Sequence, residues 1–381
     1  MDKRPLAVLI AGGKTGGHLF PGIAIARALQ RREVNTRILF VGTGEAFEVA
    51  ALEREGFCHE AIASYGIKGK RLVEKLASLA QVPLSVAQAA KIIGRFSPDM
   101  VIGVGGYSSG PVVLAARLLN RKTAIHEQNT IPGITNRILS RFVHTVFTSF
   151  QNTRGLAGGK RVVCTGNPIR KRADAAGPGA VPEALPEASK EGRDFFTLLV
   201  TGGSQGASSI NKAVVTAVQQ MARSDKELFV IHQTGERDEK TVHRAYQAMG
   251  IKAVVKEFFH DMPAQQARAD LIICRAGAGT LAEITALGKP SILVPYPHAA
   301  DDHQRFNAVA LADHGAAVMI LDRDLSGNSM AEAIFSLKNN PQRLALMAEA
   351  AQRSAKPGAD ETIAEIIMAM AGFNGELRVD N

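Results

Sequence analysis

The stretch LAVLIAGGKTGGHLFP, Leu6 to Pro21, decides the fold of the first half of the chain. Its six leading apolar residues have the length of a buried strand, and four glycines and a helical pattern follow them. A strand, a glycine-rich turn and a helix in this order open a βαβ unit of a parallel sheet. The glycines are therefore expected at the carboxyl end of a strand, where open α/β sheets bind their ligands.

Further along the first half, short apolar runs alternate with amphipathic runs. Strands are expected at TRILFVG (36–42), DMVIGVGG (99–106), KTAIHEQ (122–128), HTVFTSF (144–150) and RVVCTGNP (161–168). Helices are expected at FPGIAIARALQRRE (20–33), FEVAALEREGF (47–57) and GPVVLAARLLN (110–120). This alternation is typical of a doubly wound parallel sheet.

The composition changes at residues 173–194, which are rich in Ala, Pro, Gly and Glu and read as a linker. The alternation then restarts with strands at 195–203, 227–235, 253–259, 271–279 and 291–297 and helices at 207–222 and 280–288. The segment VLIAGGKTGGH of the first half has a coarse repeat, LLVTGGSQGAS, in the second. The sequence therefore predicts an α/β protein with two Rossmann-like domains, 1–172 and 195–359, facing across a cleft. The last helical pattern, within about 360–381, can pack back on the first domain.

Bulk composition bounds the class of protein. A chain of 381 residues is too long for one ordinary core, which agrees with two domains. The three cysteines are scattered without metal spacing, as expected in a reducing compartment. The first residues lack the features of a signal peptide, and no apolar run is long enough to span a bilayer.

The net charge of +9 is unevenly distributed. Residues 1–172 contain 25 Lys+Arg and 10 Asp+Glu, a net of +15, whereas the remainder contains 20 and 26, a net of −6. The first half should therefore attract an anionic partner, for which nucleic acid and an anionic membrane are the usual candidates. Aromatic residues make up only 5% and Trp is absent, which argues against base-stacking platforms and a nucleic-acid partner.

The first glycine loop, Gly12–Gly17, fits neither common nucleotide motif. Val8 stands where a Walker A loop needs its first glycine, and the paired glycines do not have the spacing of a dinucleotide fingerprint. What remains is a strand-to-helix turn whose backbone can approach a ligand closely, followed by a helix N-terminus that favours anions. A single turn of this kind is equally compatible with no ligand at all. Three such loops, including GGYSSGP (105–111) and GGSQG (202–206), favour binding.

His18 is expected in the first turn of the helix after that loop. A helix N-terminus disfavours imidazolium, so the ring should stay neutral and able to accept a proton. Two interpretations stand side by side: a general base, or a helix-start residue bonded to the local backbone.

In the second half, RAGAGTLAEITALG (Arg275 to Gly288) follows an expected strand. Thr280 and Glu283 have the spacing of a capping box, which by itself accounts for both residues. Alternatively, Glu283 accepts hydrogen bonds from a ribose diol while the glycine-rich helix start receives a diphosphate, which Ser204 can also reach.

Two further segments are ambiguous from spacing. In PHAADDHQRFN (297–307), Asp301 or Asp302 can cap a helix, whereas His303 and Gln304 face either solvent or a sugar. Asp322-Arg323-Asp324 matches the Asp-x-Asp metal pattern of some sugar transferases, but its position favours a solvated turn. No metal or cofactor is therefore expected.

The segment Ile67–Phe96 contains six basic residues, one acid and many aliphatic residues. A basic amphipathic helix pair of this kind can lie on an anionic leaflet, each basic residue contributing roughly 1 kcal/mol. An ordinary surface helix with a solvated charged face is the alternative. The concentration of positive charge in this half makes the membrane interpretation competitive.

The motifs GGKTGGH, GGYSSGP, IHEQN, GNPIR, GGSQGA, EFFHDMP, RAGAGTLAE and DHQ, in this order, resemble the MurG family of bacterial peptidoglycan synthesis. The resemblance covers nearly the whole chain outside the linker. It implies a GT-B architecture and a metal-independent, inverting transfer of N-acetylglucosamine from its UDP conjugate to the muramoyl 4-hydroxyl of lipid I, giving lipid II. It also implies peripheral attachment to the cytoplasmic side of the inner membrane.

The resemblance also implies site residues. Near the phosphates and the acceptor it places Thr15, Gly16, Gly17, Asn129 and Arg170. Around the UDP-sugar it places Ser204, the backbone near Phe259, Ala278, Gly279, Thr280, Leu281, Ala282, Glu283 and Gln304. His18 is the favoured base, and Glu127 is the rival carboxylate. Two departures from the family pattern are the length of the linker and Gly279, where a bulkier apolar residue can stand.

Three other functions remain open. A soluble UDP-sugar 2-epimerase uses a similar two-domain architecture but needs no membrane surface. A non-catalytic nucleotide- or membrane-binding module is opposed by the paired glycine loops and His18. A P-loop NTPase is opposed by the spacing of the first glycine loop.

Overall fold

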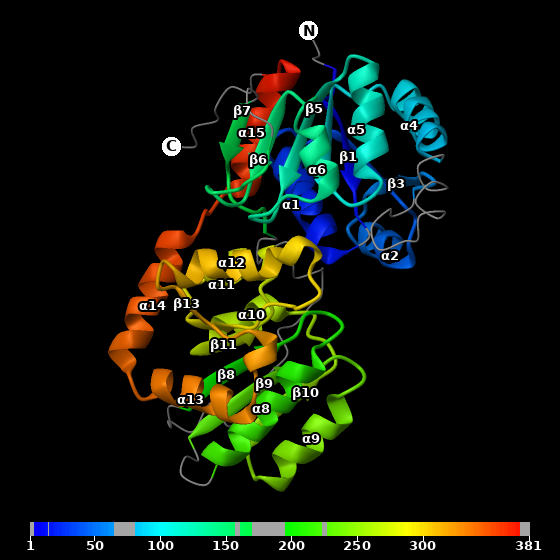
Figure 1. Ribbon diagram of the computed structural model, residues 1–381. Coiled ribbons are helices and arrows are strands. Elements are labelled where there is room, and N and C mark those ends of the chain that lie inside the picture. The colour runs from blue at the N-terminus through cyan, green and yellow to red at the C-terminus, as the bar shows by residue number, and fades with distance from the viewer. Residues whose placement is uncertain are drawn as a thin grey trace. The chain divides into compact units, whose positions relative to one another are not determined.

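The computed structural model describes residues 4–13, 15–64, 81–156, 161–169, 195–222 and 227–373. The chain forms two compact units (Figure 1), Met1–Arg170 with Lys356–Asn381, and Lys171–Ala355. Each unit is built on its own parallel sheet. Among the described residues, no helix combines the length and the apolar character needed to cross a bilayer.

The first unit contains a seven-stranded sheet in the order β3-β2-β1-β4-β5-β6-β7. Its strands are β1 (Ala7–Gly12), β2 (Arg37–Gly42), β3 (Cys58–Ala61), β4 (Met100–Gly105), β5 (Lys122–Glu127), β6 (Thr145–Thr148) and β7 (Arg161–Cys164). Its helices are α1 (Gly16–Arg32), α2 (Ala46–Arg54), α4 (Val82–Phe96), α5 (Ser109–Leu118), α6 (Ile134–Leu139) and α15 (Ala359–Ala371). The order reverses beside β1, so the helices that follow β1 and β4, α1 and α5, cover opposite faces of the sheet at a topological switch point.

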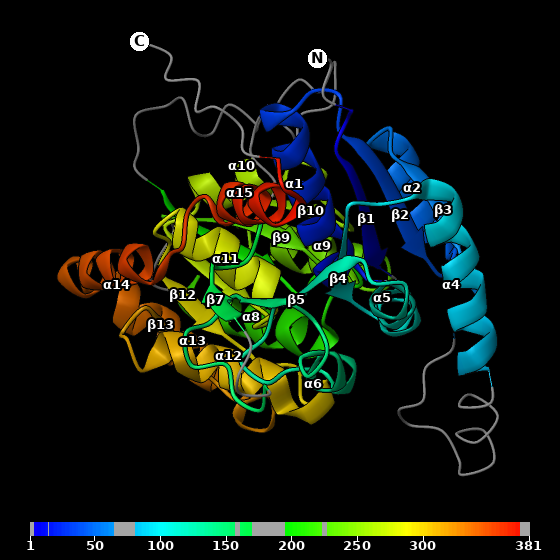
Figure 2. The ribbon, with the colours of Figure 1, turned by 90° about the horizontal axis from the view of Figure 1, so that it is seen from above.

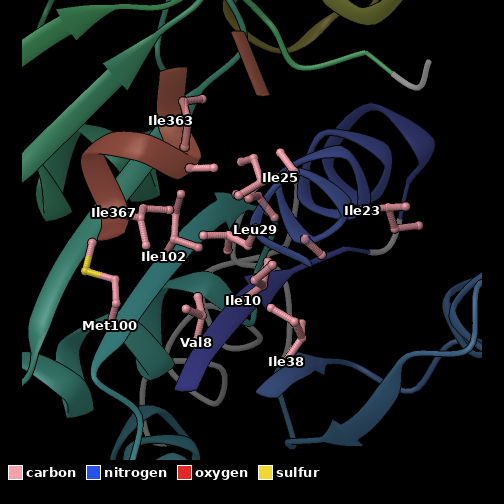
Figure 3. Packing of buried hydrophobic residues seen from close by; sticks show 14 of the residues in the cluster. Val8, Ile10, Ile23, Ile25, Leu29, Ile38, Met100, Ile102, Ile363 and Ile367 are labelled. Carbon is pink, nitrogen blue, oxygen red and sulfur yellow. The ribbon is translucent and has the colours of Figure 1, made fainter. Parts of the chain in front are cut away.

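Both faces of this sheet are covered because successive side chains of a strand point to opposite sides. Val8 and Ile10 of β1 pack with α1 and α15 in one cluster, part of which Figure 3 shows. Leu9 and Ala11 pack with α4 and α5 in another cluster. Figure 2 shows these helices around the strands of the sheet. The continuous burial of β1 explains its unbroken apolar sequence.

Helix α15 belongs to the first unit although it ends the described chain (Figure 1). Ile363 and Ile367 lie in the same apolar cluster as α1. At the edge of this contact, Arg31 in the last turn of α1 forms ion pairs with Asp360 at 2.6 Å and Glu361 at 2.8 Å. Acidic residues at the start of α15 thus meet basic residues at the end of α1, which also suits both helix dipoles.

The second unit contains a six-stranded sheet in the order β10-β9-β8-β11-β12-β13. Its strands are β8 (Phe196–Thr201), β9 (Leu228–Gln233), β10 (Lys252–Lys256), β11 (Leu271–Cys274), β12 (Ser291–Leu293) and β13 (Ala317–Met319). Its helices are α8 (Ser208–Met221), α9 (Glu239–Ala248), α10 (Met262–Arg268), α11 (Ala278–Ala286), α12 (His303–Ala312), α13 (Gly327–Lys338) and α14 (Pro341–Ser354). Short 3₁₀ helices occupy Ala300–Asp302 (η2) and Asp322–Asp324 (η3).

The predicted α/β class with two doubly wound parallel sheets is confirmed. The strand β3 was not anticipated, because its four residues CHEA are only partly buried and lack an apolar pattern. The expected strand 253–259 ends earlier, at Lys256. Its last two apolar residues belong to the loop that leads into α10.

Candidate functional site

The loops after β1 and β4 lie in backbone contact at the carboxyl edge of the first sheet. Gly12 has a φ of +134°, and a Cβ there would lie 2.2 Å from the carbonyl oxygen of Gly105. A Cβ at Gly106 would lie 3.0 Å from the carbonyl oxygen of Gly13. Glycine is therefore required at these positions both by the backbone conformation and by the close approach of the two loops. The contact brings GGKTGG and GGYSSGP together, as the strand order requires.

His18 lies on the first turn of α1, as its sequence position predicts. Thr15 is the residue before the helix, and the carbonyl oxygen of Thr15 accepts the N–H of His18 at 3.1 Å. The His18 ring lies against the second glycine loop, where a Cβ at Gly105 would be 2.8 Å from Nδ1. Gly16 and Gly17 are the first two residues of α1; Gly16 is partly buried and Gly17 is exposed. The positive end of the helix dipole and the imidazole therefore share one edge of the sheet.

Glu48 of α2 supports the first glycine loop, and sequence reasoning did not find it. The side chain is buried, and its Oε2 accepts the N–H groups of Thr43 and Gly44, both at 2.9 Å. A Cβ at Gly13 would lie 2.3 Å from Oε1 of Glu48. This carboxylate thus fixes the loop after β2 and lies against the loop after β1. A buried acid within the amphipathic pattern FEVAALE was the available signal.

Glu127 ends β5 and is only 2% exposed. Its Oε1 accepts the backbone N–H of Asn129 at 2.9 Å and the Asn129 side chain at 3.2 Å, and its Oε2 accepts the Asn136 side chain at 2.8 Å. The N–H of Gly133 donates to Oε2 at 3.3 Å. Burial raises the pKa of the Glu127 carboxyl, and these hydrogen bonds offset part of the rise. The carboxylate therefore organises the loop that presents Asn129.

His126, next to Glu127, is fully buried, and both of its ring nitrogens form hydrogen bonds within the protein. Its Nε2 donates to the carbonyl oxygen of Gly166 at 3.2 Å, and its Nδ1 accepts from the Gln128 amide at 3.1 Å. Burial lowers the pKa of His126 to about 4, so the ring is neutral at physiological pH. The Gln128 amide also donates to the carbonyl oxygen of Val104 at 2.7 Å, which connects β5 to the end of β4.

The second unit has a pocket of about 570 Å³ at the carboxyl edge of its sheet. Both the third glycine loop, Gly202–Gly206, and the starts of α8 and α11 contribute to its wall. Among the lining residues are Arg237, Arg275, Thr280, Tyr296 and Gln304. Two helix N-termini and two arginines, against the one carboxylate of Asp238, make this pocket suited to an anionic group such as a diphosphate.

Arg275 is fixed by a network that includes the Asp-x-Asp segment. Its Nη1 donates to Oδ1 of Asp322 at 2.6 Å, and its Nη2 donates to the Ser209 hydroxyl at 3.0 Å. Ser209 donates to the same Asp322 oxygen at 2.9 Å. The prediction of a solvated turn was wrong for Asp322, because β13 brings it from a distant part of the sequence to the end of β11. Arg323 and Asp324 are exposed.

The capping-box interpretation of Thr280 and Glu283 is also wrong. Helix α11 begins at Ala278 with Gly277 before it, and no side chain caps its start. Thr280 therefore lies inside the first turn and lines the pocket. The carboxylate of Glu283 accepts the Gln266 side chain of α10 at 3.0 Å. Along the same helix Ala278 and Leu281 are buried, whereas Gly279 and Ala282 are partly exposed.

The remaining predicted residues of this unit lie around the pocket. Gln304, in the first turn of α12, accepts the backbone N–H of Tyr296 at 3.0 Å, and both residues line the pocket. Ser204 is exposed in the turn of the third glycine loop, outside the lining residues. The backbone N–H of Phe259 donates to Oε1 of Gln233 at 2.9 Å, and the Phe259 side chain is buried.

Asp301 and Asp302 do not cap α12 with their side chains. Both have positive φ values, of 53° and 56°, and Asp302 precedes the helix without a side-chain cap. Asp302 instead forms an ion pair with Arg305. His303 is bonded through Nδ1 to the carbonyl oxygen of Ala300 at 2.7 Å.

Three of the expected features lie outside the described residues. These are Arg170, the whole of the linker at 173–194, and the part of the basic segment at 65–80. Within the described ranges, no group of three or more His, Cys, Asp or Glu side chains could bind a metal ion.

Comparisons with known proteins agree with this arrangement. Residues 8–148 match the glycosyltransferase family 28 N-terminal domain, and residues 197–363 match the glycosyltransferase family 28 C-terminal domain. A relative from Syntrophus aciditrophicus (strain SB), named UDP-N-acetylglucosamine--N-acetylmuramyl-(pentapeptide) pyrophosphoryl-undecaprenol N-acetylglucosamine transferase, is 47% identical over 95% of this chain and 98% of its own.

Solved structures add two further likenesses. The crystal structure of Acinetobacter baumannii MurG is 31% identical, with a TM-score of 0.77 over 96% of this chain and 100% of that one. UDP-GlcNAc 2-epimerase from Neisseria meningitidis has a TM-score of 0.66 over 96% of this chain and 100% of that one, but only 12% identity. The second likeness therefore concerns the fold alone.

Proposed function

Because the chain belongs to glycosyltransferase family 28, and within it to the MurG group with the GT-B fold, we propose that it converts lipid I to lipid II. In this reaction N-acetylglucosamine passes from UDP to the C4 hydroxyl of the muramoyl pentapeptide. The observation that carries the proposal is 47% identity over 95% of the chain to a relative named for this transfer. The epimerase alternative loses support, since it rests on likenesses of fold.

The donor, UDP-N-acetylglucosamine, is assigned to residues 195–359. The pocket there presents two helix N-termini and the side chain of Arg275 to an anionic ligand. Glu283 lies one helical turn beyond Thr280 on α11 and is only partly buried. We place the ribose hydroxyls at this carboxylate, the diphosphate at the start of α11, and the sugar beside Gln304.

The acceptor, a lipid-linked diphosphate, is assigned to residues 1–172. The exposed residues Thr15 and Gly17 at the start of α1 suit a phosphate group. Asn129 lies on the loop that Glu127 organises, at the same edge of the sheet. The positive charge of this half, +15 in formal terms, favours the acceptor electrostatically.

His18 is the proposed general base. Its Nδ1 is buried against Gly105, and we assign the other ring nitrogen, Nε2, to the acceptor hydroxyl. Nε2 accepts the proton of the 4-hydroxyl while the oxygen bonds to the anomeric carbon. The bond from that carbon to the phosphate oxygen breaks, and its electron pair leaves with UDP. Such base catalysis contributes about 10²–10⁴-fold, and the donor-site helix N-termini stabilise the charge on UDP without a metal.

Glu127 is the weaker candidate for the base. Its two oxygens accept four hydrogen bonds and the residue is 2% exposed. A carboxylate whose oxygens are occupied in this way holds the loop in place and is poorly available to accept a proton from the substrate. We therefore assign Glu127 a positioning role for Asn129.

Attachment to the anionic inner leaflet of the cell membrane, on its cytoplasmic side, is part of the proposal. Exposed apolar side chains occur on α4, α5 and α6 and just beyond them; they are Leu84, Leu118, Leu119, Ile134, Ile138 and Phe142. Residues 81–142 contain seven basic residues and two acids, Asp99 and Glu127, and both acids are buried or ion-paired. Exposed apolar side chains together with an excess of basic residues suit a membrane surface with anionic lipid headgroups.

The decisive experiment incubates the full chain with UDP-N-acetylglucosamine and a lipid I analogue, without added metal and with a chelator. UDP release and a β-1,4-linked disaccharide are expected. Formation of the C2-epimeric sugar in the absence of acceptor, still linked to UDP or released by hydrolysis, would favour the epimerase instead, and no turnover of either kind would refute the enzyme assignment.

A further inference from the structure

Gln233 connects two loops of the second unit with the two halves of one amide. It is the last residue of β9 and is 2% exposed. Its Nε2 donates to the carbonyl oxygen of Gly203 at 2.9 Å and to the Thr201 hydroxyl at 3.2 Å. Its Oε1 accepts the N–H of Phe259 at 2.9 Å. Because β9 lies between β8 and β10, this side chain spans from the third glycine loop to the loop after β10.

The bond to Gly203 determines which groups the glycine loop presents. The Gly203 carbonyl also accepts the N–H of Gly206 at 3.1 Å, so both of its lone pairs are occupied within the protein. Gly203 itself has a φ of +89°. A carbonyl oxygen turned towards an anionic ligand would repel it, whereas backbone N–H groups attract it. Gln233 thus keeps an acceptor away from the pocket that this loop lines.

The bond to Phe259 acts on the other loop. Its backbone N–H is fixed in direction by Gln233, and the Phe259 side chain is buried beneath. Neighbouring glycines pack the two loop ends further: a Cβ at Gly206 would lie 1.9 Å from the carbonyl oxygen of Thr234. The glycine loop therefore cannot shift without disturbing the loop after β9 as well.

We propose that Gln233 is a positioning residue for the donor nucleotide, which couples the glycine loop to the backbone at Phe259. The inference rests on the proposed function, since it takes the pocket to bind UDP. Only an amide of this length donates on one side and accepts on the other. A glutamate keeps the acceptor for Phe259 but loses the donor to Gly203, and a leucine loses both.

The test compares Gln233→Leu and Gln233→Glu with Tyr246→Phe. Tyr246 is buried in the same unit and bonds to Nδ1 of His232 at 2.9 Å, away from both loops, so its variant matches the loss of a buried hydrogen bond. Binding of UDP is measured by calorimetry, and kcat and both KM values are measured with the lipid I analogue. The melting temperature of each variant is recorded alongside.

Both Gln233 variants should bind UDP at least about tenfold more weakly, the equivalent of one lost interaction of about 1.4 kcal/mol. The KM for UDP-N-acetylglucosamine should rise by the same factor while the KM for the acceptor stays unchanged. Tyr246→Phe should lower the melting temperature similarly and leave UDP binding intact. Unchanged UDP affinity in Gln233→Leu would overturn this inference and leave the donor assignment in place. Failure of the wild-type chain to bind UDP would overturn the donor assignment and the inference with it.

Discussion

The imidazole of His18 packs against the backbone of Gly105, so closely that a Cβ at Gly105 would lie 2.8 Å from Nδ1. The two residues come from different elements, the first turn of α1 and the end of β4. Gly105 has a φ of +98°, so its backbone also favours glycine. The position of the proposed base is therefore set by a glycine 87 residues away in sequence, across the pairing of β1 with β4.

Gly105→Ala should displace the His18 ring and lower kcat by at least about tenfold, since small misplacements of a catalytic group are costly. Gly56→Ala is the matched control, because Gly56 also has a positive φ, of +69°, but a Cβ there would meet nothing within 4 Å. The control should lose roughly 1 kcal/mol of stability and keep its turnover. Steady-state kinetics with denaturation curves measure both effects. Equal turnover in the two variants would show that this contact does not position the base.

His18→Ala should lower turnover by at least about tenfold while UDP binding stays close to that of the wild type. The physical reason is that His18 belongs to the first unit, whereas the donor pocket is lined by residues of the second. Single-turnover kinetics separate the chemical step from product release. Unchanged turnover would remove His18 from the mechanism.

Asp322→Asn should weaken binding of the UDP-sugar in the pocket, because it removes the charged partner that fixes Arg275. The Asp322–Arg275 pair is largely buried, so its loss should destabilise the second unit by roughly 1–3 kcal/mol and raise the KM for the UDP-sugar. Asp324→Asn is the control, since the Asp324 side chain is 62% exposed. Denaturation midpoints and donor titrations distinguish the two. Equal behaviour of both variants would restore the interpretation of a solvated turn.

His232 should make the second unit less stable in acid. Burial lowers its pKa from 6.5 to about 3, with a partly opposing effect of Asp238. As the pH falls below about 6.5, the unfolded chain takes up a proton that the folded unit refuses, so the free energy of unfolding falls until about pH 3. The loss is at most about 1.4 kcal/mol per pH unit from this residue.

The measurement compares urea denaturation of the wild type and His232→Gln between pH 7 and pH 4.5. Other titrating groups affect both proteins equally, so the difference isolates His232. The wild-type curve should fall more steeply than that of the variant. Parallel curves would mean that His232 titrates alike in the folded and unfolded chain, which would contradict a lowered pKa in the folded unit.

A double variant Leu118→Glu with Phe142→Glu should reduce binding to vesicles that contain anionic lipid. Both side chains are exposed, at 70% and 47%, and Arg117 donates to the carbonyl oxygen of Phe142 at 3.1 Å, so cations and apolar groups adjoin there. Phe335→Glu, on an exposed side chain of the second unit, is the control and should sediment with vesicles like the wild type. Equal loss in both variants would point to a general effect of charge.

The sequence by itself determined the two parallel sheets, because strand-length apolar runs such as Leu6–Ala11 can bury both faces only between layers of helices. It also determined the placement of His18, since a strand, a glycine turn and a helix leave one geometry for the residue after the glycines. Both features are local, because the spacing of apolar residues and the conformational freedom of glycine depend only on residues that are close together in the sequence.

Only the tertiary structure decided which side chains support those loops. Glu48, Gln233 and Asp322 each act on backbone or side chains that lie elsewhere in the sequence or across the sheet. Their partners are set by strand order, which brings the carboxyl ends of distant strands to one edge. The Thr280–Glu283 spacing also allowed a cap, but helix α11 begins earlier, at Ala278. Thr280 therefore lines the pocket, and Glu283 accepts a hydrogen bond from Gln266 of another helix.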